Sequence, residues 1–323
     1  MKVSELRNII KDYNNDDLNN IIVELYKKFP KEKKEEYKID NYIANVKEEK
    51  RIVKEKMGFD EFTNEIRLFI KYANDGLYES YNKVISDKDR QQWRYKVMKY
   101  YKELINVDVN IYKGKIATDL LLQLYDILSK GTSRIIFSNR ETFRAIQIPQ
   151  GQFLRTVLKR KMQEDLNKKE IETIINMLSN GVDNETCYDY LMYIYLNCLK
   201  DDEQRLISLE ITKNKIIDLQ EKLNSDNAKK YSSYEFNVSE EINAYTALVL
   251  FLSIRTNQVD DGIKFFYKNY IEKSRETLMY ILLGYLEVFE LYNEWIREYE
   301  KKKINYRDEL KEKYEEIKKK TIS

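Results

Sequence analysis

Residues that interrupt helices are rare in this chain of 323 residues, which contains 2 Pro and 8 Gly. Apolar residues recur with the period of an amphipathic helix, as at Tyr188, Leu191, Tyr195 and Leu199. Proline and glycine are the residues that most disfavour a helix interior, and spacings of three, four and seven place side chains on one helix face. The sequence therefore predicts an all-α, multi-helical fold.

The few helix-breaking positions divide the predicted helices into three regions. Residues 1–57 form an N-terminal helix–loop–helix region, in which Asn15 is a candidate N-cap and Pro30 ends the second helix. Residues 58–128 form a middle helical region, and residues 129–323 form a C-terminal domain of paired helices. Short connections between antiparallel helices favour an irregular α-solenoid, or stacked helical hairpins, for this last domain.

The missing residue types exclude whole classes of chemistry. The chain has no histidine, so it cannot build a Ser-His-Asp triad, a Cys-His pair or an HExxH zinc site. Its glycines lie too far apart for a GxGxxG or P-loop phosphate cradle. Cys187 and Cys198 are eleven residues apart in one predicted helix, about 16 Å along its axis, which is too far for a disulfide. We expect two buried free thiols, no metal and no cofactor.

Two further patterns bear on location and on a competing enzymatic hypothesis. The longest apolar stretches, 244–254 and 278–289, are too short to span a bilayer. Together with the free thiols and a polar N-terminus, they predict a cytoplasmic protein without membrane contact. Three Glu-x-Lys triplets, at 48–50, 309–311 and 316–318, leave open a metal-dependent nuclease. Such triplets arise by chance in Lys/Glu-rich helices, so a non-enzymatic protein is favoured.

The charge is unevenly distributed along the chain. Residues 1–161 carry 33 basic and 24 acidic residues, a net charge of +9, whereas residues 162–323 carry 24 and 31, a net charge of −7. One basic segment lies on a predicted helix with Trp93, Val97, Tyr100 and Leu104 on its core face. Its opposite face carries the candidate phosphate-binding residues Lys96, Lys99 and Lys102.

The second basic segment, 139–161, has the layout of a helix-turn-helix reader. Ser138 and Glu141 have the spacing of a capping box, which predicts a helix beginning near Asn139. Pro149 interrupts it, and a second helix begins near Gln150. The candidate nucleic-acid contacts of this segment are Arg140, Arg144, Gln152, Arg155 and Lys159, because Arg and Gln read guanine and adenine edges. A helical hairpin with a basic surface is the alternative interpretation.

Two stretches carry a resemblance to known sequences. Residues 4–10 (SELRNII), followed by 17–27 (DLNNIIVELYK), and residues 81–97 (YNKVISDKDRQQWRYKV) resemble uncharacterised helical proteins of low-GC Gram-positive bacteria, a domain of unknown function. The N-terminal part is also loosely similar to the SAP-type helix–loop–helix, a small DNA-binding module, although the loop at 13–16 lacks its usual glycine. The resemblance implies a helical fold and a bacterial cytoplasmic setting.

Taken together, these patterns predict a non-enzymatic helical binding or scaffold protein that acts through contacts with a protein partner. Stacked helices offer extended surfaces to partners, and tyrosine, present 27 times, is enriched at interfaces. The alternative prediction is a nucleic-acid-binding protein that uses the basic N-terminal half.

Overall fold

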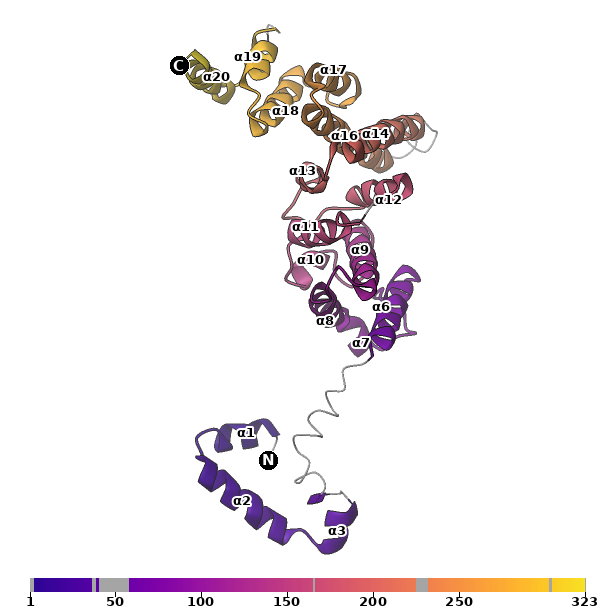
Figure 1. The fold of residues 1–323 in the computed structure, drawn as a ribbon, viewed down its shortest axis with the longest axis vertical. Coiled ribbons are helices and arrows are strands. Elements are labelled where there is room, and N and C mark those ends of the chain that lie inside the picture. The colour runs from indigo at the N-terminus through magenta and orange to yellow at the C-terminus, as the bar shows by residue number, and fades with distance from the viewer. Residues whose placement is uncertain are drawn as a thin grey trace. The chain divides into compact units, whose positions relative to one another are not determined.

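The computed structural model describes residues 3–36, 39–40, 58–164, 166–224, 232–301 and 304–322. Every regular element over these residues is a helix, and none of them forms a strand. The all-α, multi-helical prediction is therefore confirmed (Figure 1). The charged segment that follows α3, including the triplet at 48–50, lies almost entirely outside the described residues.

The chain divides into two compact units, Met1–Phe62 and Thr63–Ser323. The first unit holds α1 (Val3–Ile10), α2 (Asn15–Lys28) and α3 (Lys31–Glu36), and the boundary falls inside α6 (Phe59–Asn74). The other helices are α7 (Asp87–Gln91), α8 (Trp93–Ile105), α9 (Tyr112–Ser133), α10 (Thr142–Ala145), α11 (Gln150–Lys161), α12 (Lys168–Leu178), α13 (Tyr188–Cys198), α14 (Asp202–Leu223), α16 (Ser232–Arg255), α17 (Val259–Asn269), α18 (Arg275–Val288), α19 (Tyr292–Lys301) and α20 (Asp308–Ile322).

The predicted boundary between residues 128 and 129 is wrong, because α9 runs through it without interruption. Leu128, Ser129 and Gly131 are all buried in α9, which ends two residues after this glycine, at Ser133. The missing side chain of Gly131 leaves room for Phe137 and Thr142, which a Cβ at this position would meet at 3.1 and 2.8 Å.

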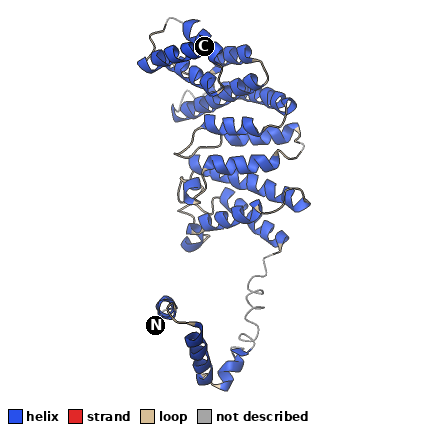
Figure 2. Ribbon diagram, turned by 60° about the vertical axis from the view of Figure 1, so that its left-hand side comes forward, coloured by secondary structure: helices blue, strands red, loops and turns tan. Residues whose placement is uncertain are grey.

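Helices of the second unit pack mainly on helices that are close to them in the chain. The main packed pairs are α8 with α9, α9 with α11, α11 with α13, α12 with α14, α13 with α16, α14 with α16, α16 with α17, α18 with α19, and α19 with α20. Figure 2 shows the helices of this unit lying side by side, and the labels and colours of Figure 1 give their order along the chain.

Aromatic rings fill the N-terminal part of this core. Trp93 stacks on Phe137 at 4.2 Å between ring centroids, and Phe69 contacts Tyr78 and Tyr100 at 5.0 and 5.6 Å. The predicted core face of α8 is confirmed, because its four members are at most 2% exposed. Burying large aromatic side chains is a main source of stability in cores of this kind.

Two local predictions at helix ends need correction. The N-cap of α2 is Asn14, not Asn15, because the Asn14 side chain accepts a hydrogen bond from the Asp17 backbone N–H at 2.9 Å. The cysteines stand at the two ends of α13 and are free, as expected. Neither is buried as predicted, because Cys187, which precedes the helix, is exposed and Cys198 is half-buried.

The helix-turn-helix interpretation fails at its first helix. The α10 helix has a single turn and begins at Thr142, not near Asn139. The Asn139 side chain accepts a hydrogen bond from the Glu141 backbone N–H at 2.8 Å, a local turn that competes with helix formation. Gln147, with φ 56°, then ends the helix. The second helix, α11, does begin at Gln150. The single turn of α10 is nevertheless too short to serve as the supporting first helix of a helix-turn-helix motif.

Candidate functional site

The candidate nucleic-acid residues lie in separate places. Lys96 is half-buried on α8, and Lys99 and Lys102 are exposed there. Lys99 is 3.9 Å from the Glu65 carboxylate of α6. Exposed Arg144 on α10 forms an ion pair with Glu141 at 3.3 Å. Two of the seven predicted cations, Lys99 and Arg144, are therefore already next to carboxylates of the same chain.

Three other candidates share one exposed face of α11. Gln152, Arg155 and Lys159 project away from the core at spacings of three and four, as predicted. The Arg155 guanidinium donates a hydrogen bond to the Tyr190 hydroxyl of α13 at 3.3 Å. On the other side, the Tyr101 hydroxyl of α8 lies 3.3 Å from Thr156. This α11 face is thus bordered by the 44% exposed Tyr190 on the α13 side and by the buried Tyr101 on the α8 side.

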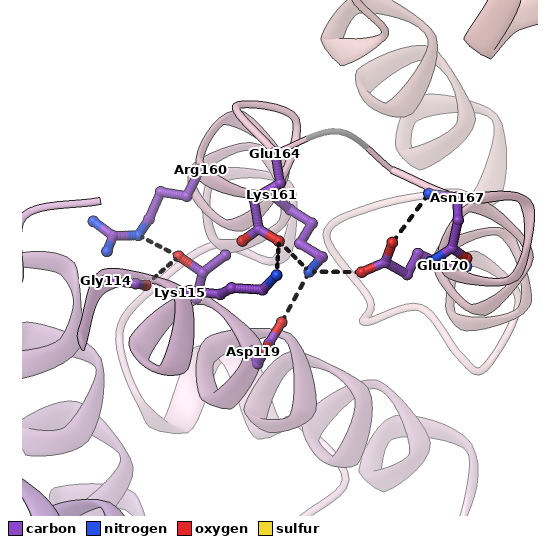
Figure 3. Close-up of polar contacts among 9 residues, drawn as sticks. Gly114, Lys115, Asp119, Arg160, Lys161, Glu164, Asn167 and Glu170 are labelled. Atoms are coloured by element: carbon purple, nitrogen blue, oxygen red, sulfur yellow. Dashed lines mark hydrogen bonds and ion pairs between the residues drawn. The ribbon is translucent and has the colours of Figure 1, made fainter. Parts of the chain in front are cut away.

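Two further cations of the basic segment serve internal contacts (Figure 3). The Arg160 guanidinium donates to the carbonyl oxygens of Ile105 and Val107, at 3.1 and 2.9 Å. Lys161 is 3% exposed, and its ammonium group contacts Asp119 of α9, Glu164 and Glu170 of α12 at 3.0, 2.8 and 3.3 Å. Burial lowers the pKa of Lys161, but the hydrogen bonds with the first two carboxylates outweigh it, so that pKa is raised.

A cleft of about 770 Å³ lies on another side of the second unit. It lies between the C-terminal end of α9, the α12–α13 connection, the end of α14 and the first half of α16. Its lining residues are Thr132, Ser133, Arg134, Arg140, Ser179, Asn180, Val182, Tyr188, Leu219, Lys222, Tyr234, Phe236, Asn237, Val238, Glu240 and Glu241. A cleft of this size is in the range of natural ligand sites. Among the predicted site residues, it contains Arg140.

Gly181 and Gln150 fix the α12–α13 connection against α9 and so form one wall of the cleft. Gly181 has φ 154°, and a Cβ there would overlap Thr132 and the Ser129 carbonyl oxygen. Gln150 is 1% exposed. Its amide nitrogen donates to the Gly181 carbonyl oxygen and its amide oxygen accepts from the Asp183 backbone N–H, both at 2.9 Å. A connection without regular structure is thereby held by a buried side chain.

The opposite wall carries carboxylates. The Ser179 hydroxyl donates to Glu241 at 2.8 Å and lies 2.9 Å from the Tyr245 hydroxyl, which in turn donates to the Ile175 carbonyl oxygen at 3.1 Å. These contacts hold the Glu241 carboxylate in place at the cleft. Burial, and then the nearby Asp189 carboxylate, raise the pKa of Glu240.

The cleft is therefore lined both by cations, Arg134, Arg140 and Lys222, and by the carboxylates Glu240 and Glu241. Arg134 and Arg140 are exposed, and neither forms an ion pair with another described residue. Phe236 is 64% exposed at the α16 wall. The cleft thus combines exposed guanidinium groups, an exposed aromatic ring and a hydrogen-bonded carboxylate.

Sequence reasoning identified Arg140 but not the rest of the cleft, because its residues come from four segments without a common spacing. The described residues contain no cluster of three or more acidic or cysteine side chains that could hold a metal ion. Across the same ranges, no helix combines the length and the apolar character needed to cross a bilayer. Comparison with known proteins adds no identity: no family model, curated protein or solved structure matches this chain.

Proposed function

We propose that this chain is a non-enzymatic, cytoplasmic helical scaffold that binds a segment of a partner protein in the cleft between α9, α14 and α16. The observation that carries the proposal is that Arg134 and Arg140 line one cleft together with Glu240 and Glu241. A peptide segment is the ligand class that offers acidic, basic and apolar side chains at short spacing. The Phe236 ring supplies apolar contact area at the rim, as interface aromatics do.

Selection of peptides from a random display library on the immobilised full chain tests this proposal. We expect the enriched peptides to contain an acidic residue near an apolar one. The doubly charge-reversed variant Arg134→Glu/Arg140→Glu should lose these peptides and enrich basic ones, because like charges repel across an interface. Arg144→Glu, an exposed arginine outside the cleft, is the matched control and should select the same peptides as the wild type. If all three proteins select the same peptides, or none is enriched, the cleft is not the site.

Nucleic-acid binding is a second candidate function, favoured by the α11 face. Gln152, Arg155 and Lys159 lie together there, and the neighbouring Tyr190 ring is 44% exposed, so a base could stack on it as bases do on the aromatics of single-stranded binding surfaces. Fluorescence anisotropy with labelled single-stranded and duplex DNA at about 50 mM salt is the test, because phosphate contacts weaken steeply with salt. Arg155→Glu/Lys159→Glu should weaken binding at least about tenfold, and an absence of wild-type binding at low salt would exclude this function.

A further inference from the structure

The α2 helix of the first unit presents an apolar face that is exposed to solvent. No residue of α2 is buried. Ile21, Ile22 and Leu25 are 37%, 53% and 54% exposed, and Leu18 is half-exposed. These four positions follow the spacing of one helix face. An amphipathic helix of this length is stabilised mainly by packing of its apolar face, so this face needs an occupant.

The order of the apolar residues is symmetric along the helix. Leu18 lies three residues before Ile21, and Leu25 lies three residues after Ile22. A second α2 that runs antiparallel, related by a twofold axis between the two isoleucines, sets each leucine against the other leucine. The isoleucines then pair at the centre. Such an isologous contact, in which both copies use the same surface, is the commonest way in which identical chains associate.

The charges flanking this face have the matching symmetry. Asp17 and Lys28 are eleven residues apart, which returns them to nearly the same angle around the helix. In an antiparallel pair, the flank of one helix meets the same flank of the other. Measured along the helix axis, Lys28 of one copy then lies about 3 Å beyond Asp17 of the other, an offset that a lysine side chain can span. Lys28 forms no ion pair with another described residue, whereas its neighbour Lys27 is 2.8 Å from Glu24.

The other flank of α2 is already used by the chain itself. The Tyr26 hydroxyl donates a hydrogen bond to Asp40 at 2.6 Å, and the Lys34 ammonium group lies 3.9 Å from the centre of the Tyr26 ring. The flank with Asp17 and Lys28 is therefore the one that remains for a partner. We propose that a second copy of this chain packs antiparallel on α2, so that the N-terminal unit is a self-association element. This proposal is independent of the cleft.

Sedimentation analysis of the full chain between about 1 and 100 μM, the range of moderate association constants, tests the proposal. The wild type should form a dimer whose fraction rises with concentration. Ile22→Glu places charges next to the twofold axis and should give a monomer at every concentration. Asp17→Lys and Lys28→Asp should each raise the dissociation constant at least about fivefold, because each replaces an attraction by a repulsion twice per dimer.

The combined variant Asp17→Lys/Lys28→Asp distinguishes lost complementarity from a damaged helix. Exchanging both charges restores the pair, so the dissociation constant should return to within about twofold of the wild type. Asn20→Lys, on the opposite face of α2, is the matched control and should leave association unchanged. A monomeric wild type, a dimeric Ile22→Glu variant, or a charge exchange without rescue would each overturn the proposal.

Discussion

Lys161 joins three segments through one buried ammonium group, and its removal should be costly. Lys161→Met keeps the apolar stem but leaves Asp119, Glu164 and Glu170 without their shared cation. Breaking a buried ion pair on one side typically costs about 3–5 kcal/mol, and we expect a loss near the lower end because Asp119 is 44% exposed. Urea denaturation of wild type and variant measures the difference.

Lys168 supplies the control for this measurement. Its ion pair with Glu210 is 59% exposed on both sides, and exposed pairs contribute about 0–1 kcal/mol. Lys168→Met should therefore change the free energy of unfolding by less than about 1 kcal/mol. Equal changes in the free energy of unfolding for the two substitutions would show that the buried Lys161 network contributes no more than an exposed ion pair.

Asp189 makes stability depend on pH in the direction opposite to most carboxylates. Burial raises its pKa, although the Tyr285 hydroxyl donates a hydrogen bond to it at 2.5 Å. A carboxyl with a raised pKa in the folded state binds more protons there than in the unfolded chain. Its charge therefore destabilises the protein increasingly as pH rises above the unfolded value of 3.8 and through the folded pKa.

Asp189→Asn removes this charge while its amide oxygen still accepts the Tyr285 hydrogen bond. We expect a higher Tm than the wild type at pH 7–8 and a difference that shrinks toward zero near pH 4. Scanning calorimetry across this range is the measurement. Asp261→Asn, on an exposed carboxylate, should show no such trend, and an Asp189→Asn variant less stable than the wild type at neutral pH would contradict the assignment.

Among the helices, α17 crosses α16 closely because Gly262 has no side chain. A Cβ at this position would stand 2.7 Å from the Cβ of Ser253, so Gly262→Ala should separate the two helices and cost about 1–3 kcal/mol. Gly284 in α18 is the control, because it is also a helical glycine but a Cβ there would meet nothing within 4 Å. Gly284→Ala should stabilise the protein by about 0.5–1 kcal/mol through the unfolded state. Paired denaturation curves that fail to move in opposite directions would contradict this packing.

The last helix illustrates what element-level patterns predict well. The narrow stripe of Leu310, Tyr314 and Ile317 predicts a helix that docks along one edge, and Leu310 and Ile317 are 4% and 3% exposed. Tyr314 stacks on Tyr299 of α19 at 4.5 Å between ring centroids. The apolar stripe of α20 therefore packs against the same chain. A coiled-coil contact with a partner is not needed to explain why these residues are apolar.

At the scale of the whole molecule, the fold class was predictable and the cleft was not. Helical periodicity and scarce helix breakers are local signals, so they reveal helices such as α8 and α11 with their core faces. The cleft depends on Gly181 and Gln150, whose roles arise from contacts between segments about thirty residues apart. The capping-box spacing at 138–141 likewise predicted a helix start that is wrong, because a turn at Asn139 forms there instead of the helix. Local patterns cannot weigh such competing long-range and short-range contacts.

The chain-order packing of the second unit has a consequence for how it folds and opens. Because most helices contact only near neighbours, few long loops must close, and a low contact order favours fast folding. The terminal pair α19 and α20 is anchored from one side only, so it should detach without unfolding the helices before it. Hydrogen exchange of amides in α20 is then expected to be much faster than in α16. A molecule built in this way loses its order progressively from its end rather than all at once.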